Sequence, residues 1–179
     1  MIGGVARRYA RALFLIGEER RSLELVTSEV ETLAQTWSES DELRNVMLNP
    51  LFPMSKRRDI LRAIVDKLGV SEIARNAAML LLDRSRLPAL PHIAKGLRLL
   101  ADEREGKVRA EVVSAAPLPD QYFERLRARL EAMTGKRVIL ERRLDPSLIA
   151  GLVARVGDRL YDGSARTRLA EIREALTES

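Results

Sequence analysis

The sequence contains no cysteine and only one histidine among its 179 residues. Disulfide bonds and thiolate metal sites are therefore excluded, and no pair of histidines is available to bind a metal ion. Aromatic residues make up only 4% of the chain, so we expect an aliphatic core. No apolar run approaches the roughly 20 residues that a membrane-spanning helix requires. We therefore expect a soluble protein without a disulfide framework or a structural metal.

Catalytic motifs fail on spacing. Gly135 and Lys136 suggest a phosphate-binding loop, but that motif needs glycine at position 130 and serine or threonine at position 137. Those positions hold Leu130 and Arg137, which excludes the motif. The lone histidine, His92, is expected on a helix surface or in packing, because nothing in the sequence pairs with it as a base or a ligand. We expect no catalytic residue and no cofactor.

Three aspartates near the carboxyl end, Asp145, Asp158 and Asp162, could in principle bind a cation or transfer protons. Each lies beside proline or glycine, where aspartate usually forms a turn or caps a helix. We therefore expect structural roles for them and no metal ion.

The chain is moderately basic, with 31 Lys and Arg against 26 Asp and Glu and a pI of about 10.0. Acidic residues interleave with the basic ones throughout, which is typical of solvated faces and not of a phosphate-binding track. Residues 1–17 hold three arginines and no acid, as a mitochondrial transit peptide does, but they lack serine and we expect them to be part of the folded protein. A basic RNA-associated adaptor remains as an alternative function.

Hydrophobic periodicity predicts six helices before Gly106, joined by short connections. Serine and glycine or proline mark most of their ends, with Ser55 and Ser71 expected as N-caps. On the fourth helix we expect Ile60, Leu61, Ile64, Val65 and Leu68 to face inward. The helices are expected from about Val5 to Glu19, after Ser22 through Trp37, after Ser40 to before Asn49-Pro50, from Ser55 to Gly69, from Ser71 to about Arg84, and from near Pro88 to before Gly106.

After Gly106 the period changes to two, as in a half-buried strand. A helix is expected after Pro119, with Phe123, Leu126, Leu130 and Met133 on its inner face. Further strands are expected at 137–144, 152–156 and 159–161, followed by a helix from Ser164 toward Leu176. The fold class is therefore α+β, with a helical bundle at 1–105 and, at 106–179, a small domain of a short mixed sheet and two helices.

The first and fifth helices carry apolar residues over roughly 200°, whereas a bundle helix needs little more than 100° to bury. The surplus predicts an apolar groove that receives an amphipathic helix from a partner. Its alternative is that both helices are simply buried all round. The outer residues that we expect to bind the partner are Val5, Tyr9, Ala12 and Ile16 on the first helix and Ile73, Ala77 and Leu80 on the fifth.

Five segments, in order, resemble a known family. They are VARRYARALF at 5–14, LNP at 48–50, RLPALPHI at 86–93, VRAEVVSAAPL at 108–118 and DPSLIAGLVARVGDRLYDGSARTRL at 145–169. The chain resembles, over essentially its whole length, the delta subunit of bacterial F-type ATP synthase, whose mitochondrial counterpart is the oligomycin-sensitivity-conferring protein.

This resemblance implies a non-catalytic stator subunit that resists torque during proton-driven ATP synthesis. It implies that domain 1–105 binds the amino-terminal helices of alpha subunits, and that domain 106–179 binds the carboxyl ends of the stalk b subunits. One copy per complex, no nucleic acid, and a peripheral place at the cytoplasmic face of the bacterial inner membrane follow from the same resemblance. By matching positions, Tyr9, Ala12 and Leu80 are the implied contacts with the alpha subunit.

Overall fold

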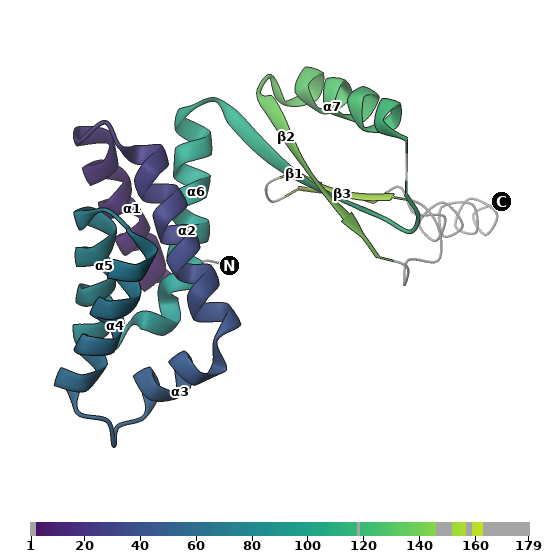
Figure 1. Ribbon diagram of the computed structural model, residues 1–179. Coiled ribbons are helices and arrows are strands. Elements are labelled where there is room, and N and C mark those ends of the chain that lie inside the picture. The colour runs from purple at the N-terminus through teal and green to yellow at the C-terminus, as the bar shows by residue number, and fades with distance from the viewer. Residues whose placement is uncertain (1–2, 118, 146–151, 157–158, 163–179) are drawn as a thin grey trace. The chain divides into compact units, whose positions relative to one another are not determined.

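The computed structural model describes residues 3–117, 119–145, 152–156 and 159–162. The chain divides into two compact units, Met1–Ala101 and Asp102–Ser179, which are described separately below. The first unit is helical and the second holds a sheet (Figure 1). No helix within the described residues is long and apolar enough to cross a membrane.

The helices of the first unit follow the predicted periodicity closely. They are α1 (Gly4–Glu19), α2 (Leu23–Glu39), α3 (Asp41–Leu48), α4 (Met54–Leu68), α5 (Glu72–Asp83), a 3-10 turn at Leu87–Ala89, and α6 (Leu90–Arg104), whose last residues belong to the second unit. Gly69 ends α4 with a φ of 64°, as a left-handed C-cap should. The α+β class is confirmed.

The core of the first unit is aliphatic, as the scarcity of aromatic residues predicts. Leu81, Ile93, Leu97 and Val65 are among its fully buried side chains. The single tryptophan, Trp37 on α2, is also buried. On α4 the inward face is narrower than predicted. Leu61 and Val65 are buried and Ile64 is half-buried, whereas Ile60 and Leu68 are exposed, so their prediction as inward residues was wrong.

Of the two predicted N-caps, Ser55 is wrong, whereas Ser71 occupies the N-cap position of α5 without a side-chain capping bond. Helix α4 begins at Met54 with Pro53 before it, so Ser55 lies inside the first turn. Ser71 does precede α5, but its side chain makes no capping bond to that helix. Instead its hydroxyl donates to the carboxylate of Glu29 on α2, and the same carboxylate accepts the Ser71 backbone N–H at 2.7 Å. A residue distant in sequence therefore anchors the start of α5.

The second unit is built around a mixed sheet. Its described elements are β1 (Lys107–Ser114), α7 (Asp120–Thr134), β2 (Arg137–Leu144), β3 (Leu152–Val156) and β4 (Arg159–Asp162). The strand order is β2-β1-β3-β4, with β1 parallel to β2 and the other two pairings antiparallel. Parallel neighbours need a crossover, and α7 supplies it. The predicted helix from Ser164 lies outside the described residues.

Helix α7 covers one face of the sheet near β1 and β2 (Figure 1). Phe123 and Leu130 are buried against it and Leu126 is partly buried, as predicted. Met133 is 58% exposed, so its placement on the inner face was wrong. On β1, Ala110 and Val112 are fully buried, in keeping with the predicted alternation.

Candidate functional site

Helix α1 has one buried row of residues and, beside it on the same helix, a row that is exposed or half-buried. Ala6, Ala10, Leu13 and Gly17 are buried, at the spacing expected for the core face of a helix. The four residues predicted to face outward are less enclosed. Val5 and Tyr9 are half-buried, Ala12 is exposed and Ile16 is 41% exposed. The alternative that this helix is buried all round is therefore wrong for the isolated chain.

Helix α5 shows the same asymmetry to a smaller extent. Ala74, Ala78, Leu81 and Leu82 are buried. Leu80 is 45% exposed, as the wide apolar arc predicted. Ile73 and Ala77 are only half-buried, and both pack against the core from its edge. The apolar surplus on α5 is thus concentrated at its carboxyl end.

A hollow of about 520 Å³ joins the exposed parts of these two helices. Its lining residues are Val5, Arg8, Tyr9, Ala12, Leu80, Arg84 and Arg86. Four of the seven residues predicted from sequence therefore share one concave surface. Ile16, Ile73 and Ala77 are not among its lining residues. The floor is apolar and carries one phenol, a composition suited to a helix face.

Sequence reasoning missed the three arginines of this hollow. Arg8 falls in the polar arc of the helical wheel, so it is not marked as part of an apolar surface. Arg84 and Arg86 lie after the end of α5, where no helical spacing is available to predict which way their side chains point. A usable signal was the charge of the segment itself, since residues 84–86 read Arg-Ser-Arg directly after the apolar run of α5.

The turn after α5 holds Arg84 and Arg86 beside the hollow. Ser85 has a φ of 54°, the left-handed conformation that usually favours glycine. The Ser85 N–H donates to the Leu82 carbonyl at 2.9 Å, and the Arg86 N–H donates to the Leu81 carbonyl at 2.7 Å. These two bonds form a Schellman motif, which fixes the backbone on both sides of Ser85. The two arginines therefore project from a defined turn.

The charges of the hollow are of one sign. Its lining contains three guanidinium groups and no carboxylate. Asp83, the nearest acidic residue in sequence, pairs with Arg58 on α4 at 2.8 Å. Within the described residues, Arg8, Arg84 and Arg86 form no side-chain ion pair. The hollow thus combines an apolar floor with an unneutralised basic rim.

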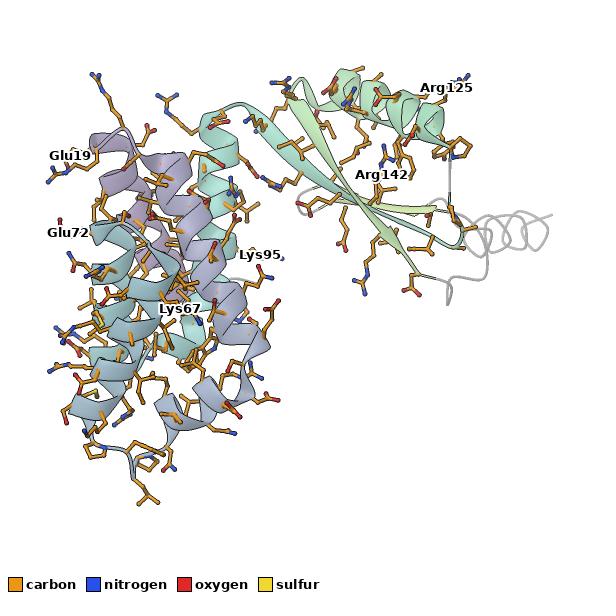
Figure 2. All side chains as sticks on the ribbon, in the orientation of Figure 1. Glu19, Lys67, Glu72, Lys95, Arg125 and Arg142 are labelled. Carbon is orange, nitrogen blue, oxygen red and sulfur yellow. The ribbon has the colours of Figure 1, made fainter. Side chains whose placement is uncertain are left out.

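The second unit has a separate hollow of about 400 Å³ between α7 and β2. Phe123, Val138 and Leu140 form its apolar part, and Arg127, Arg137 and other charged side chains surround them. Arg142 lies on the side of the sheet that faces α7 (Figure 2), with its guanidinium carbon 4.1 Å from the centre of the Phe123 ring. The described residues contain no cluster of three metal-ligating side chains, in this hollow or elsewhere.

Comparison with known proteins gives a consistent assignment. The family model described as ATP synthase delta (OSCP) subunit matches residues 5–176. The ATP synthase subunit delta of Desulfosudis oleivorans is 40% identical over 172 residues, covering 96% of this chain and 94% of the relative. That of Myxococcus xanthus is 40% identical over 174 residues and covers 96% of each chain.

Solved structures agree in fold. A chain of the mitochondrial ATP synthase hexamer of Toxoplasma gondii aligns with a TM-score of 0.76 at 25% identity, covering 98% of both chains. A chain of the Polytomella F-ATP synthase aligns over 56% of this chain with a TM-score of 0.51. None of these matches supports the RNA-associated alternative. The chain therefore belongs to the ATP synthase delta (OSCP) family, and it is a non-catalytic stator subunit of the ATP synthase.

Proposed function

We propose that the hollow between α1 and α5 binds the amino-terminal helix of an ATP synthase alpha subunit. Val5, Tyr9, Ala12 and Leu80 form the contact surface, and Ile16, Ile73 and Ala77 extend it along the two helices. The observation that carries this proposal is the meeting of exposed apolar residues from two helices in one concave surface. The small side chain of Ala12 leaves room for a partner helix to approach closely.

The cost of leaving this surface in water supports the same assignment. Exposed Leu80 and Ile16 each gain by being removed from solvent, at about 25 cal/mol per Å² of apolar area. An amphipathic helix with apolar residues at three- and four-residue spacing would cover the exposed apolar residues of both α1 and α5. Helix α1 does not need to move to receive it, because its buried stripe already packs against the core.

The decisive variant is Ala12→Arg. Ala12 is exposed, so a larger side chain is accommodated in the free protein but obstructs a helix bound in the hollow. We expect a loss of several kcal/mol in binding, the size typical of a disrupted interface centre. The measurement is titration calorimetry of the full chain with the amino-terminal peptide of the alpha subunit, with circular dichroism of each variant.

The matched control is Ala63→Arg, because Ala63 is an exposed alanine on α4 that does not line the hollow. It should bind as the wild type does. Tyr9→Asp is the weaker test, since Tyr9 also packs against the core and its loss affects stability. Wild-type affinity in Ala12→Arg with intact helicity would remove the hollow from the interface.

For the second unit we propose contact with the carboxyl ends of the b subunits. Its hollow between α7 and β2 offers an apolar surface with a charged rim, which suits a polypeptide partner. We also propose that the two units act as domains 1–105 and 106–179, and that one copy serves each complex at the cytoplasmic face of the bacterial membrane. This subunit then acts as a passive link, which works by resisting torque.

A further inference from the structure

We propose that the basic rim of the hollow between α1 and α5 selects a partner helix whose apolar face is flanked by carboxylates. Arg84 and Arg86 are the main selecting residues, and Arg8 assists them from α1. This inference rests on the proposed function, because it concerns the partner of the same hollow. It adds a charge requirement to a contact that was assigned on apolar residues alone.

The first argument is the absence of an internal partner. The three arginines line one hollow of about 520 Å³, and none of the described residues offers a carboxylate to them within it. Asp83, the acidic residue next to Arg84 in sequence, pairs with Arg58 on α4 at 2.8 Å. Like charges held together repel one another, so an incoming carboxylate would relieve an existing unfavourable interaction.

The second argument is the kind of cation. Arginine presents a planar fork of donors that matches a carboxylate with two parallel hydrogen bonds, which lysine does not. The rim contains arginine only. Arg84 and Arg86 are held by the hydrogen-bonded turn at Ser85, so less conformational entropy is lost when they bind.

The third argument separates a helix from a nucleic acid. Phosphates favour a hydrated basic track with stacking surfaces. Here Val5, Ala12 and Leu80 line the same hollow as the arginines, and aliphatic side chains form no hydrogen bond or ion pair with a phosphate backbone. An amphipathic helix satisfies both parts of the hollow, with its apolar side chains on the floor and its carboxylates at the rim.

The charges should act mainly on the rate of association. Complementary charges at a rim steer the encounter and raise the association rate, whereas the apolar centre sets the dissociation rate. The effect must fall with salt, because the Debye length shrinks from about 30 Å at 0.01 M to about 3 Å at 1 M ionic strength. A measurement of rates at these two salt concentrations therefore separates the rim from the floor.

The test uses the full chain and the alpha-subunit amino-terminal peptide in stopped-flow experiments. The double variant Arg84→Gln/Arg86→Gln should associate several-fold more slowly than the wild type at low salt, on the order of 5- to 10-fold. The two proteins should converge at high salt, with dissociation rates that differ little. A peptide with its acidic residues changed to amides should slow the wild type and leave the double variant unaffected.

The control double variant is Lys67→Gln/Lys95→Gln. It removes the same charge from exposed positions on α4 and α6 that do not line the hollow (Figure 2). It should retain the wild-type rates, and circular dichroism should show that all variants keep their helices. If it slowed association as much as the rim variant does, net charge and not the rim would be responsible.

The outcomes distinguish this inference from the function on which it rests. If the wild type fails to bind the peptide at either salt concentration, the proposed function fails. If it binds, but the rim variant keeps the wild-type salt dependence or the amide peptide binds equally fast, the charge requirement is overturned. An RNA oligonucleotide that binds the wild type and is lost in the rim variant would also overturn it, in favour of a phosphate site.

Discussion

Gly17 on α1 lies in close contact with Leu23, the first residue of α2. A side-chain carbon added at Gly17 would lie 2.9 Å from the Cα of Leu23 and 3.1 Å from its Cδ1. The first of these atoms is backbone and cannot rotate away. The tight connection between the two helices therefore depends on the missing side chain, and not on the conformational freedom of glycine.

We predict that Gly17→Ala lowers the free energy of unfolding by about 1–2 kcal/mol, because overpacking outweighs the better helix propensity of alanine. Urea denaturation would measure this change in the free energy of unfolding, monitored by the fluorescence of Trp37, which is the only tryptophan of the sequence and is buried.

The control for this prediction lies on the same helix. An added carbon at Gly4 would have no atom within 4 Å, so Gly4→Ala should change stability by less than about 0.5 kcal/mol. Equal effects of the two substitutions would show that the contact with Leu23 yields easily, and that Gly17 is replaceable.

For single residues, the sequence predicts the place of a residue in its helix better than the residues with which its side chain bonds or packs. It places Ser71 correctly before α5, but the bond of Ser71 to Glu29 comes from a residue 42 positions away. No local pattern contains that information. Helical spacing likewise gives the direction of Met133 but not whether another element covers it, and Met133 is 58% exposed.

At the scale of elements, Arg98 joins α6 to α2. Its Nε and one terminal nitrogen donate to the two carboxylate oxygens of Glu31 at 2.8 and 2.6 Å. Its other terminal nitrogen donates to Glu24 at 2.9 Å. The hydrogen bonds from Arg98 to Glu31 raise the pKa of Arg98 above its usual range. The stability that these bonds add to the folded state is fully present below the ordinary arginine pKa. It is lost only as the pH rises through the raised pKa of Arg98 in the folded protein.

We predict that Arg98→Met destabilises the first unit by about 1–3 kcal/mol, since charge-assisted bonds are lost and Glu31 is left without its partner. Urea denaturation of the variant and the wild type provides the measurement.

The comparison variant for Arg98 is Arg62→Met. Arg62 makes a single exposed contact with Asp59 at 4.0 Å, and such pairs contribute about 0–1 kcal/mol. A small effect in both variants would mean that apolar packing alone holds α6 against α2.

The sequence predicts the two helices that form the hollow, but it does not predict the basic rim of Arg8, Arg84 and Arg86. The stripe of α1 follows from periodicity, because the alternation of three and four residues is a property of one helix. The rim depends on how α1 and α5 pack and on the turn at Ser85, which brings residues about 75 positions apart to one surface. Arg8 therefore becomes part of the hollow only when the tertiary structure exists.

At the scale of the molecule, the division into binding domains 1–105 and 106–179 stays a prediction. At the boundary between these predicted domains the chain passes through Glu103, Arg104 and Glu105, all exposed, and then Gly106, whose φ is 64°. Exposed polar residues next to a glycine, where a helix ends, are a preferred site for proteases. Helix α6 continues to Arg104, so a fragment that ends there keeps the helix whole.

We predict that limited trypsin digestion cuts first after Arg104. The fragment up to Arg104 should remain helical, because its core cluster contains no residue from the second unit. It should keep the buried environment of Trp37, bind the alpha-subunit peptide with the affinity of the full chain, and fail to bind the carboxyl-terminal peptide of a b subunit. Mass spectrometry, tryptophan fluorescence and titration calorimetry would establish these points in turn.

The control is an intact chain in which Arg104→Gln removes the predicted cleavage site, with circular dichroism to compare its helix content with that of the wild type. It should resist the first cut and bind both peptides. If cleavage instead unfolded both parts together, the units would be one cooperative structure and the assignment of one partner to each would lose its basis. If the fragment still bound the b peptide, the stalk contact would lie on the helical unit, and the torque would pass through α1–α6 alone.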